Sequence, residues 1–252
     1  ALAAATSYSR SYTQPLALVF PEDPRVLGQV NMLFRSNIPE NGDHSTFLYD
    51  QLRKEMIAKA LEHEEVLVAE HDVRMVVISL LSPAQKMNRA EKAYFEAHPS
   101  KGMFINYPII GEKRDPSAYS ETSLQIKAED LSWMVDDIEG LLDLIQHHLQ
   151  LFVPGKSTFV VFHCQHGHDR TGEIAGAWGI RYGRMSLEQV NALNYQVGPF
   201  NSHIQFPNQR ALTWYCHHLH QVLGYNDLEC THENLNKHHT HKPRMLHWNR
   251  TR

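Results

Sequence analysis

The sequence is poor in cysteine, in long apolar runs and in basic excess. It has 3 cysteines among 252 residues, too few for the disulfide framework of a small secreted scaffold. No apolar stretch approaches the roughly 20 residues that a membrane-spanning helix needs. The formal net charge of −4 argues against general nucleic-acid binding, because the basic residues that neutralise a phosphate backbone are not in excess. The remaining composition, 42% hydrophobic and 21% charged, is that of an ordinary globular protein.

Three regions differ in composition along the chain, and no internal repeat connects them. Residues 1–25 lack apolar periodicity, and we expect a loose lead-in. Residues 26–228 alternate apolar runs with amphipathic segments and form one predicted domain. Residues 229–252 carry several histidines among Asn, Lys and Arg. Their spacing does not supply a full ligand set, so we predict a basic surface tail that docks on anionic partners rather than a metal site.

Strand-like and helix-like patterns alternate through the predicted domain. The apolar runs typical of strands span 29–36, 73–80, 103–110 and 159–162. The segments with helical spacing span 48–68, 84–98, 130–149, 173–182 and 209–223, and a further helix follows Ser186, which forms a capping-box pattern with Gln189. Asp130 is the expected N-cap of the helix over 130–149, and the charged segment 111–127 is expected to be a loop. This order predicts an α/β fold with a single central, mostly parallel sheet flanked by helices.

The loop over residues 163–172 combines the features of an anion site. It connects an apolar strand to a buried helix and contains Gly167. A loop in this position presents a concave ring of backbone N–H groups at a helix N-terminus, and such a ring binds an oxyanion. Cys164 opens the loop and Arg170 closes it six positions later. A thiol and a guanidinium are therefore predicted to lie around one bound anion.

Each residue type in this loop has a chemical reason. Cys164 lies where the helix dipole favours negative charge, so we expect its thiol to ionise easily and to act as a nucleophile. Arg170 presents a rigid fork of donors that fits two oxygens of a phosphoryl group. Gly167 permits a positive φ and a close approach of the backbone. Thr171 can donate its hydroxyl to the thiolate, and His163 can steady the loop. The predicted substrate-binding set is Gln165, His166, Gly167, His168, Thr171 and His163.

The pattern His163-Cys164-x5-Arg170-Thr171-Gly172 resembles the phosphate-binding loop of the cysteine-dependent protein tyrosine and dual-specificity phosphatase superfamily. Its Gly-x-Asp-Arg-Thr form is most similar to bacterial tyrosine and lipid phosphatases and to the myotubularin-type phosphoinositide phosphatases. Many bacterial members carry Lys where this chain has His168, so the fixed charge here is smaller. The resemblance extends over about 33–196, and implies a tyrosine-phosphatase-like fold and a phosphocysteine mechanism without metal or other cofactor.

The segment Arg35-Ser36-Asn37-Ile38-Pro39 leaves two interpretations open. Taken by itself, it is a strand that ends in a proline-marked turn, with Arg35 in solvent. The spacing Arg-Ser-x-x-Pro after a short strand also resembles the entry to many small dual-specificity phosphatases.

A phosphocysteine route needs a general acid that protonates the leaving oxygen. Asp115 follows the third predicted strand, in the place of the superfamily's mobile acid loop, although the usual Trp-Pro-Asp is missing. Asp169 lies inside the phosphate loop, where the acid role is assigned in the myotubularin type. Asp130 is already explained by capping, and Glu121 is a further alternative. The acid therefore stays open between Asp115 and Asp169.

We therefore predict a phosphomonoester hydrolase. Its expected substrates are phosphotyrosine or other phosphoproteins, or inositol phosphates and phosphoinositides. Two histidines in the loop, His166 and His168, gain charge in acid, which would favour polyanionic substrates as the pH falls. The alternative is an inactive module that binds a phosphorylated ligand, although binding alone does not require the thiol. A sulfurtransferase is disfavoured because Arg170 and Thr171 suit a phosphoryl dianion.

The expected partners are a phosphorylated substrate and no nucleic acid, and peripheral membrane contact is compatible with a lipid substrate. A catalytic Cys164 must be reduced, which favours the cytoplasm or another reducing compartment. For a bacterial protein, this includes the cytosol of a host cell into which the protein is secreted.

Overall fold

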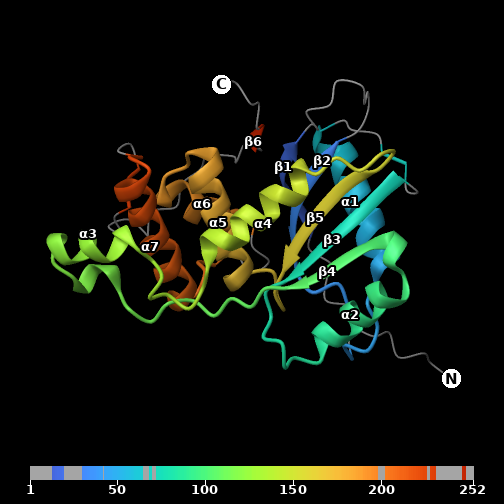
Figure 1. Ribbon diagram of the computed structural model, residues 1–252, viewed down its shortest axis with the longest axis horizontal. Coiled ribbons are helices and arrows are strands. Elements are labelled where there is room, and N and C mark those ends of the chain that lie inside the picture. Colours follow the sequence, from blue (N-terminus) through green and yellow to red (C-terminus); the bar gives the residue numbers. More distant parts are fainter. Residues whose placement is uncertain are drawn as a thin grey trace.

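The computed structural model describes residues 13–19, 30–41, 43–64, 68–69, 72–197, 202–225, 228–230 and 246–247. Its strands are β1 (Thr13–Val19), β2 (Asn31–Ser36), β3 (Val73–Ser79), β4 (Gly102–Asn106), β5 (Ser157–His163) and β6 (Leu246–His247). Its α-helices are α1 (Tyr49–Glu64), α2 (Met87–Ala97), α3 (Glu121–Glu129), α4 (Ile138–Gln150), α5 (Asp169–Gly183), α6 (Leu187–Val197) and α7 (Phe206–Val222). Short 3-10 turns occupy Pro99–Lys101 and Pro116–Ala118. The helices lie on both sides of the sheet (Figure 1).

The sheet has the order β4-β3-β5-β2-β1-β6. The four strands from β4 to β2 are parallel, and β1 pairs antiparallel with β2. The prediction of a single, mostly parallel sheet is therefore confirmed. His163 is in register with Ser79 of β3 and Ser36 of β2, so three strands end at one edge. Loops at the carboxyl ends of parallel strands form the usual ligand site of an open α/β sheet.

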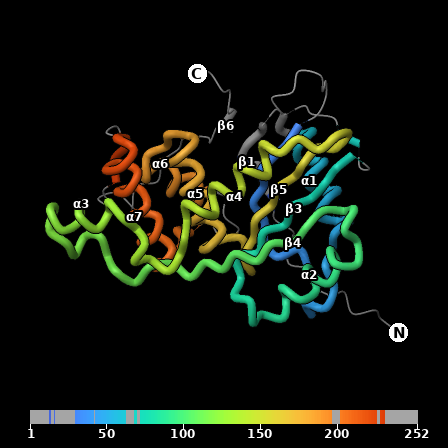
Figure 2. Tube along the Cα trace, viewed as in Figure 1, coloured from blue at the N-terminus to red at the C-terminus, as the bar shows by residue number. Residues whose placement is uncertain are grey.

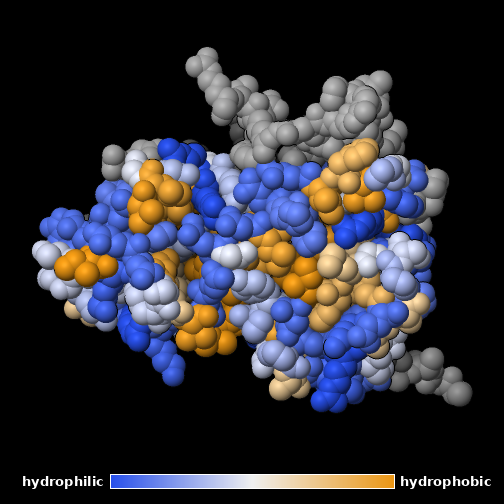
Figure 3. Space-filling model, viewed as in Figure 1, coloured by the Kyte–Doolittle hydropathy of each residue, from blue (hydrophilic) through white to orange (hydrophobic). Residues whose placement is uncertain are grey.

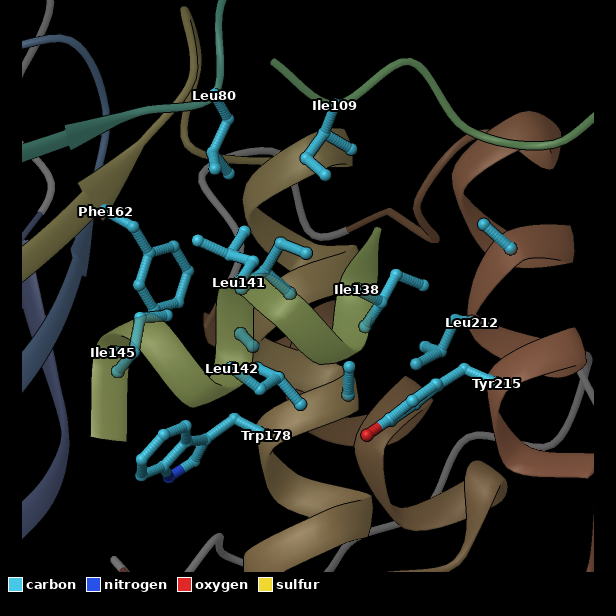
Figure 4. Packing of buried hydrophobic residues seen from close by; sticks show 14 of the residues in the cluster. Leu80, Ile109, Ile138, Leu141, Leu142, Ile145, Phe162, Trp178, Leu212 and Tyr215 are labelled. Carbon is cyan, nitrogen blue, oxygen red and sulfur yellow. The ribbon is translucent and has the colours of Figure 1, made fainter. Parts of the chain in front are cut away.

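Alternate residues of each central strand pack against opposite helical layers. Leu33, Val76 and Phe162 face the core that α4, α5 and α7 cover, whereas Phe34, Val77 and Val161 face the core under α1 and α2. Figure 4 shows the first core, where side chains from β5, α4, α5 and α7 converge. A sheet buried on both faces explains why the strands carry nearly continuous apolar runs. Helix α5, which packs in the first of these cores, is buried along most of its length.

The first strand lies within the segment predicted as a loose lead-in. β1 pairs with β2 from Thr13 to Val19, with a register shift between Pro15 and Ala17. The prediction of a loose segment is thus wrong for 13–19. Pairing with the edge of β2 stabilises a strand here that the composition of the segment did not predict. Residues 1–12 lie outside the described residues. Of the predicted tail, the histidine-rich part from 231 to 245 also lies outside them, while β6 pairs parallel with β1.

The segment between β4 and α4 differs from its prediction. It contains α3, capped by the Ser120 hydroxyl, where a loop was expected. The next helix begins at Ile138 rather than near Asp130, and Asp137 supplies the N-cap by accepting the Gly140 N–H. α3 lies beside α7 (Figure 2). The ring of Trp133 packs edge-on against that of Trp214, with 5.0 Å between the ring centroids. Tertiary packing therefore shapes the segment between β4 and α4.

Two of the three cysteines form a disulfide. Cys216 of α7 is joined to Cys230, and the two Cα atoms lie 5.7 Å apart. The low cysteine count argued against a disulfide framework and did not predict this single bond, which forms because the chain turns back after α7. Cys164 is the free cysteine. The reducing compartment stays a prediction.

Candidate active site

The loop that joins β5 to α5 lies at the edge where the parallel strands end. Cys164 follows directly on β5 and is 3% exposed. The His163 carbonyl accepts a hydrogen bond from the Leu80 N–H at 2.8 Å, which ties the start of the loop to the end of β3. Arg170 lies in the first turn of α5, and its Nη1 donates to the Leu80 carbonyl at 3.4 Å. The structure therefore ties both ends of the predicted loop, beside Cys164 and at Arg170, to Leu80 at the end of β3.

The Thr171 hydroxyl contacts Cys164, as predicted. The contact is with the backbone N–H of Cys164, whereas the sequence predicted one with its thiolate. Thr171 is fully buried, and its Oγ1 accepts the backbone N–H of Cys164 at 2.9 Å. A hydroxyl that accepts this bond keeps its own hydrogen for another acceptor. At the same helix start, His168 occupies the N-cap of α5 without a side-chain capping bond. The dipole and N–H groups of this helix end therefore favour an anion in the loop.

Gly167 takes the conformation that the sequence predicted. Its φ is +68°, and a Cβ at this position would lie 2.7 Å from both the Asn37 nitrogen and the Ser36 carbonyl oxygen. The loop is thus pressed against the end of β2, where Ile38 also donates its N–H to the Gln165 carbonyl at 3.2 Å. A residue with a side chain would strain the backbone and open this contact.

Arg35 is a site residue whose burial the sequence left open. It is fully buried at the end of β2, and its Nη2 donates to the Gly167 carbonyl at 3.0 Å. Its Nη1 donates to Oδ1 of Asn194 at 2.6 Å, and Asn194 donates in turn to the Gly172 carbonyl at 2.9 Å. One guanidinium therefore holds the loop and α6 together. The interpretation of Arg35 as a solvated charge is wrong; the signal that favoured the other interpretation was its place before Ser36-x-x-Pro39.

The two loop histidines lie in different surroundings. His168 is buried, and its Nε2 lies 3.1 Å from the Ser202 hydroxyl and 3.2 Å from the His203 carbonyl oxygen. Its ring therefore joins the loop to the segment before α7. His166 is exposed and Gln165 is half-buried. His166 is consequently the more accessible of the two rings.

The two acid candidates are both held by neighbouring groups. Asp115 caps the turn that follows it, accepts the Ser117 N–H and hydroxyl, and pairs with Nη2 of Arg210 at 3.1 Å. The hydrogen bonds from Ser117, with the nearby Arg210 charge, lower the pKa of Asp115. Asp169 lies beside Arg170, and its Oδ1 accepts the Gln205 N–H at 2.8 Å. In this conformation Asp115 is an anionic cap, and it must leave Arg210 and Ser117 before it can donate a proton.

The remaining acid candidates lie in the segment between β4 and α4, and both are exposed. Asp130 is exposed and accepts the Ser132 N–H at 2.8 Å. Hydrogen bonds from Ser132 lower its pKa. Glu121 is exposed in the first turn of α3. Neither makes a described contact with the loop.

A buried carboxyl pair lies under the segment that carries Asp115. Asp136 accepts the Ile110 and Gly111 N–H groups, and burial, followed by the charge of Glu112, raises its pKa. Glu173 of α5 is fully buried, and its Oε2 accepts a hydrogen bond from Nδ2 of Asn208 at 2.7 Å. Burial and the Asp136 carboxylate raise the pKa of Glu173 well above its usual range. The sequence carried no signal for this pair beyond acidic residues in apolar surroundings.

Apolar side chains lie exposed near the same segments. Ile110, Val135 and Phe206 are 59%, 75% and 70% exposed. The segments that carry Ile110 and Phe206 lie side by side, because Glu112 donates its N–H to the Pro207 carbonyl at 2.8 Å. Figure 3 shows apolar surface at the lower edge, near the N-terminal end of α7. Gln205, which precedes Phe206, binds Asp169 of the loop, so this apolar surface adjoins the site.

Neither a metal cluster nor a membrane span is found in the part of the chain that the structure describes. No group of three or more His, Cys, Asp or Glu side chains there is arranged to hold a metal ion. The helices there are all too short or too polar to traverse a bilayer.

No protein-family model and no curated protein matches the chain. Solved structures with some similarity include TpbA of P. aeruginosa, 13% identical over 84% of this chain and 98% of its own, with a TM-score of 0.38. The core catalytic domain of the PP-IP phosphatase SIW14 from S. cerevisiae is 11% identical over 73% and 80%, with a TM-score of 0.37. A protein tyrosine phosphatase (putative) from Leishmania major is 15% identical over 82% and 96%, with a TM-score of 0.34. Scores this low carry no argument about activity, which rests on the loop itself.

Proposed function

We propose that this chain is a phosphatase that hydrolyses phosphomonoesters through a phosphocysteine intermediate on Cys164. The observation that supports it best is the placement of Cys164 and Arg170 at the two ends of one loop at the N-terminus of α5. The backbone N–H groups and the guanidinium bind the phosphoryl oxygens, and the thiolate lies behind the phosphorus. This arrangement suits in-line displacement at a phosphate.

The reaction has two steps. In the first, the Cys164 thiolate forms a bond to phosphorus while the ester P–O bond breaks, and a carboxylic acid gives its proton to the leaving oxygen. In the second, water attacks the phosphocysteine, the S–P bond breaks, and inorganic phosphate leaves with the thiolate regenerated. Arg170 stabilises the charge on the transferring group in both steps. No cofactor takes part.

The test is hydrolysis of p-nitrophenyl phosphate with a chelator present and with vanadate as inhibitor. We expect chelator-insensitive, vanadate-sensitive turnover. Cys164→Ser should lower kcat by about 10³-fold or more, because a hydroxyl does not ionise at neutral pH, while inorganic phosphate still binds. Retained turnover in Cys164→Ser would reject the nucleophile. Phosphate binding by a wild-type protein without turnover would instead support the inactive binding module.

We further propose that His166 contributes to substrate choice. Its imidazole is exposed beside the phosphate loop, where a side chain that donates N–H groups favours a substrate with several phosphates. The ratio of kcat/KM for an inositol polyphosphate to that for a phosphotyrosine peptide should then fall in His166→Gln. His168→Gln is the comparison, because the His168 ring is bound to Ser202 and His203. A ratio that His166→Gln leaves unchanged would remove His166 from substrate choice.

A further inference from the structure

Three titratable side chains lie together behind the nucleophile. Glu40 follows β2, Glu91 belongs to α2, and His163 ends β5 immediately before Cys164. Their exposed fractions are 7%, 0% and 0%. Nε2 of His163 lies 2.9 Å from Oε1 of Glu91. Three elements that are distant in sequence therefore converge on one buried acid–base cluster, which the proposed mechanism does not use.

The cluster can be charged only if its charges are paired. An isolated buried charge is strongly disfavoured, whereas a contacting pair of opposite sign is tolerated. Burial alone lowers the pKa of His163, but the contacting Glu91 carboxyl group outweighs burial and raises that pKa. Burial and then the Glu91 charge raise the pKa of Glu40 to about 8, so Glu40 adds no second negative charge at neutral pH. The geometry therefore pairs the His163 ring with Glu91.

The imidazole of His163 lies between the Glu91 carboxyl group and the backbone of Cys164. Nε2 of His163 contacts Glu91, while the other ring nitrogen, Nδ1, lies 3.4 Å from the Cys164 carbonyl oxygen. Glu91 is consequently on the far side of the imidazole from the Cys164 carbonyl group. A cation that is closer to a thiolate than its counter-ion stabilises the thiolate form.

Among the described residues, two other titratable side chains lie near the cluster. Nδ1 of His44 lies 3.3 Å from Oε2 of Glu40, and His44 is partly exposed. Lys86 acts on Glu40 from the surface, where its Nζ donates to the Asp43 carbonyl at 3.2 Å. Both groups lie next to Glu40 rather than next to Glu91. Glu91 is thus the carboxylate that directly contacts His163.

We propose that Glu91 is a positioning residue that keeps His163 protonated and oriented behind Cys164, and that this buried ion pair promotes ionisation of the nucleophile. The proposal rests on the proposed function of Cys164. Glu91 contacts neither substrate nor the reacting atoms, and acts through His163.

Alkylation by iodoacetamide tests this on the full chain. Cys216 and Cys230 are in a disulfide, so the reagent modifies Cys164. For Glu91→Gln we expect the rate at pH 6 to fall by about fivefold or more and to converge with the wild-type rate in alkaline solution, where even an ordinary thiol is ionised. Glu96→Gln is the matched control, because Glu96 lies on the same helix and is exposed. An unchanged rate profile in a folded Glu91→Gln variant would overturn the proposal.

A double-mutant cycle separates this effect from general destabilisation. His163→Gln should slow alkylation to a similar degree, and Glu91→Gln/His163→Gln should be no slower than either single variant, because all three lose the same imidazolium. Glu91→Asp keeps the charge and should recover part of the rate. Additive losses in the cycle would mean two independent structural effects and would contradict the ion pair.

The wild-type protein provides a readout that no folding defect can obscure. The ¹⁵N chemical shifts of the His163 ring at pH 7 should be those of an imidazolium, and a neutral ring would reject the proposal whatever the variants do. The two proposals also fail differently. If Cys164 of the wild type alkylates only as an ordinary thiol does, the activated nucleophile of the proposed function fails. If it alkylates readily at pH 6 and Glu91→Gln changes nothing, only the role of Glu91 fails.

Discussion

Arg35 donates a hydrogen bond from its Nη2 to the carbonyl oxygen of Gly167 across 132 residues of sequence, at a distance of 3.0 Å. The bond turns this carbonyl toward β2. Amide groups of a loop that binds an anion must present N–H rather than C=O to the ligand. A buried cation on the far side of the loop therefore favours the anion-binding orientation.

Arg35→Lys tests this support. Lysine keeps the charge but cannot reach both Gly167 and Asn194 with a planar fork. We expect kcat/KM for p-nitrophenyl phosphate to fall by about tenfold or more with the far-ultraviolet circular dichroism unchanged. Arg89→Lys, an exposed position on α2, is the control. Equal activity in both variants would contradict the support.

Arg170→Lys probes the anion contact itself. A lysine ammonium cannot contact two phosphoryl oxygens as a guanidinium does, so we expect kcat to fall by about 10³-fold. Steady-state kinetics with p-nitrophenyl phosphate measure this loss. Activity within a few-fold of the wild type would remove Arg170 from transition-state stabilisation.

The general acid is identified by leaving-group dependence. Asp115→Asn and Asp169→Asn are compared on p-nitrophenyl phosphate and on an alkyl phosphate. Loss of the true acid should lower kcat/KM about tenfold more for the alkyl phosphate, because its leaving oxygen needs the proton. If Asp115 is the acid, Arg210→Gln should keep the wild-type ratio of kcat/KM between the two substrates. This variant removes the ion pair that holds Asp115 in its anionic, capped position but leaves the Asp115 carboxyl group in place. Equal losses on both substrates at both positions would exclude both residues.

Glu173 predicts a pH dependence of stability. Burial and the Asp136 carboxylate raise its pKa in the folded chain, so the folded state holds a proton that the unfolded state releases above its usual pKa of about 4.5. This contribution is fully present below pH 4.5 and is lost as the pH rises toward the folded-state value. Glu173→Gln mimics the protonated form and can keep a hydrogen bond to Asn208.

The measurement is thermal unfolding from pH 5 to 8. We expect the Tm of Glu173→Gln to exceed that of the wild type at pH 8 by about 3 °C or more, the shift that about 1 kcal/mol produces in a chain of this size, and to approach it at pH 5. Glu121→Gln, at an exposed position, should follow the wild type. A Tm difference that does not change with pH would contradict a proton held by Glu173.

The sequence by itself determined the parts that depend on neighbouring residues. The strand, loop and helix around Cys164, the positive φ of Gly167 and the Ser186–Gln189 capping box all follow from local spacing, and the structure has them. The α/β class also followed, because alternating apolar periods and a buried sheet impose it. Each of these patterns is complete within a few turns of chain, so no distant partner is needed to interpret it.

Only the tertiary structure decided which distant residues meet. It paired Arg35 with Gly167, Glu91 with His163 and Cys216 with Cys230. It also added β1 to the sheet and placed the start of α4 at Ile138. Composition cannot distinguish a buried charge from a solvated one, because the free energy of burial depends on a partner that another element supplies. The cluster behind Cys164 exists because β2 and β5 lie beside each other and end at one edge of the sheet, where the fold also places Glu91 of α2.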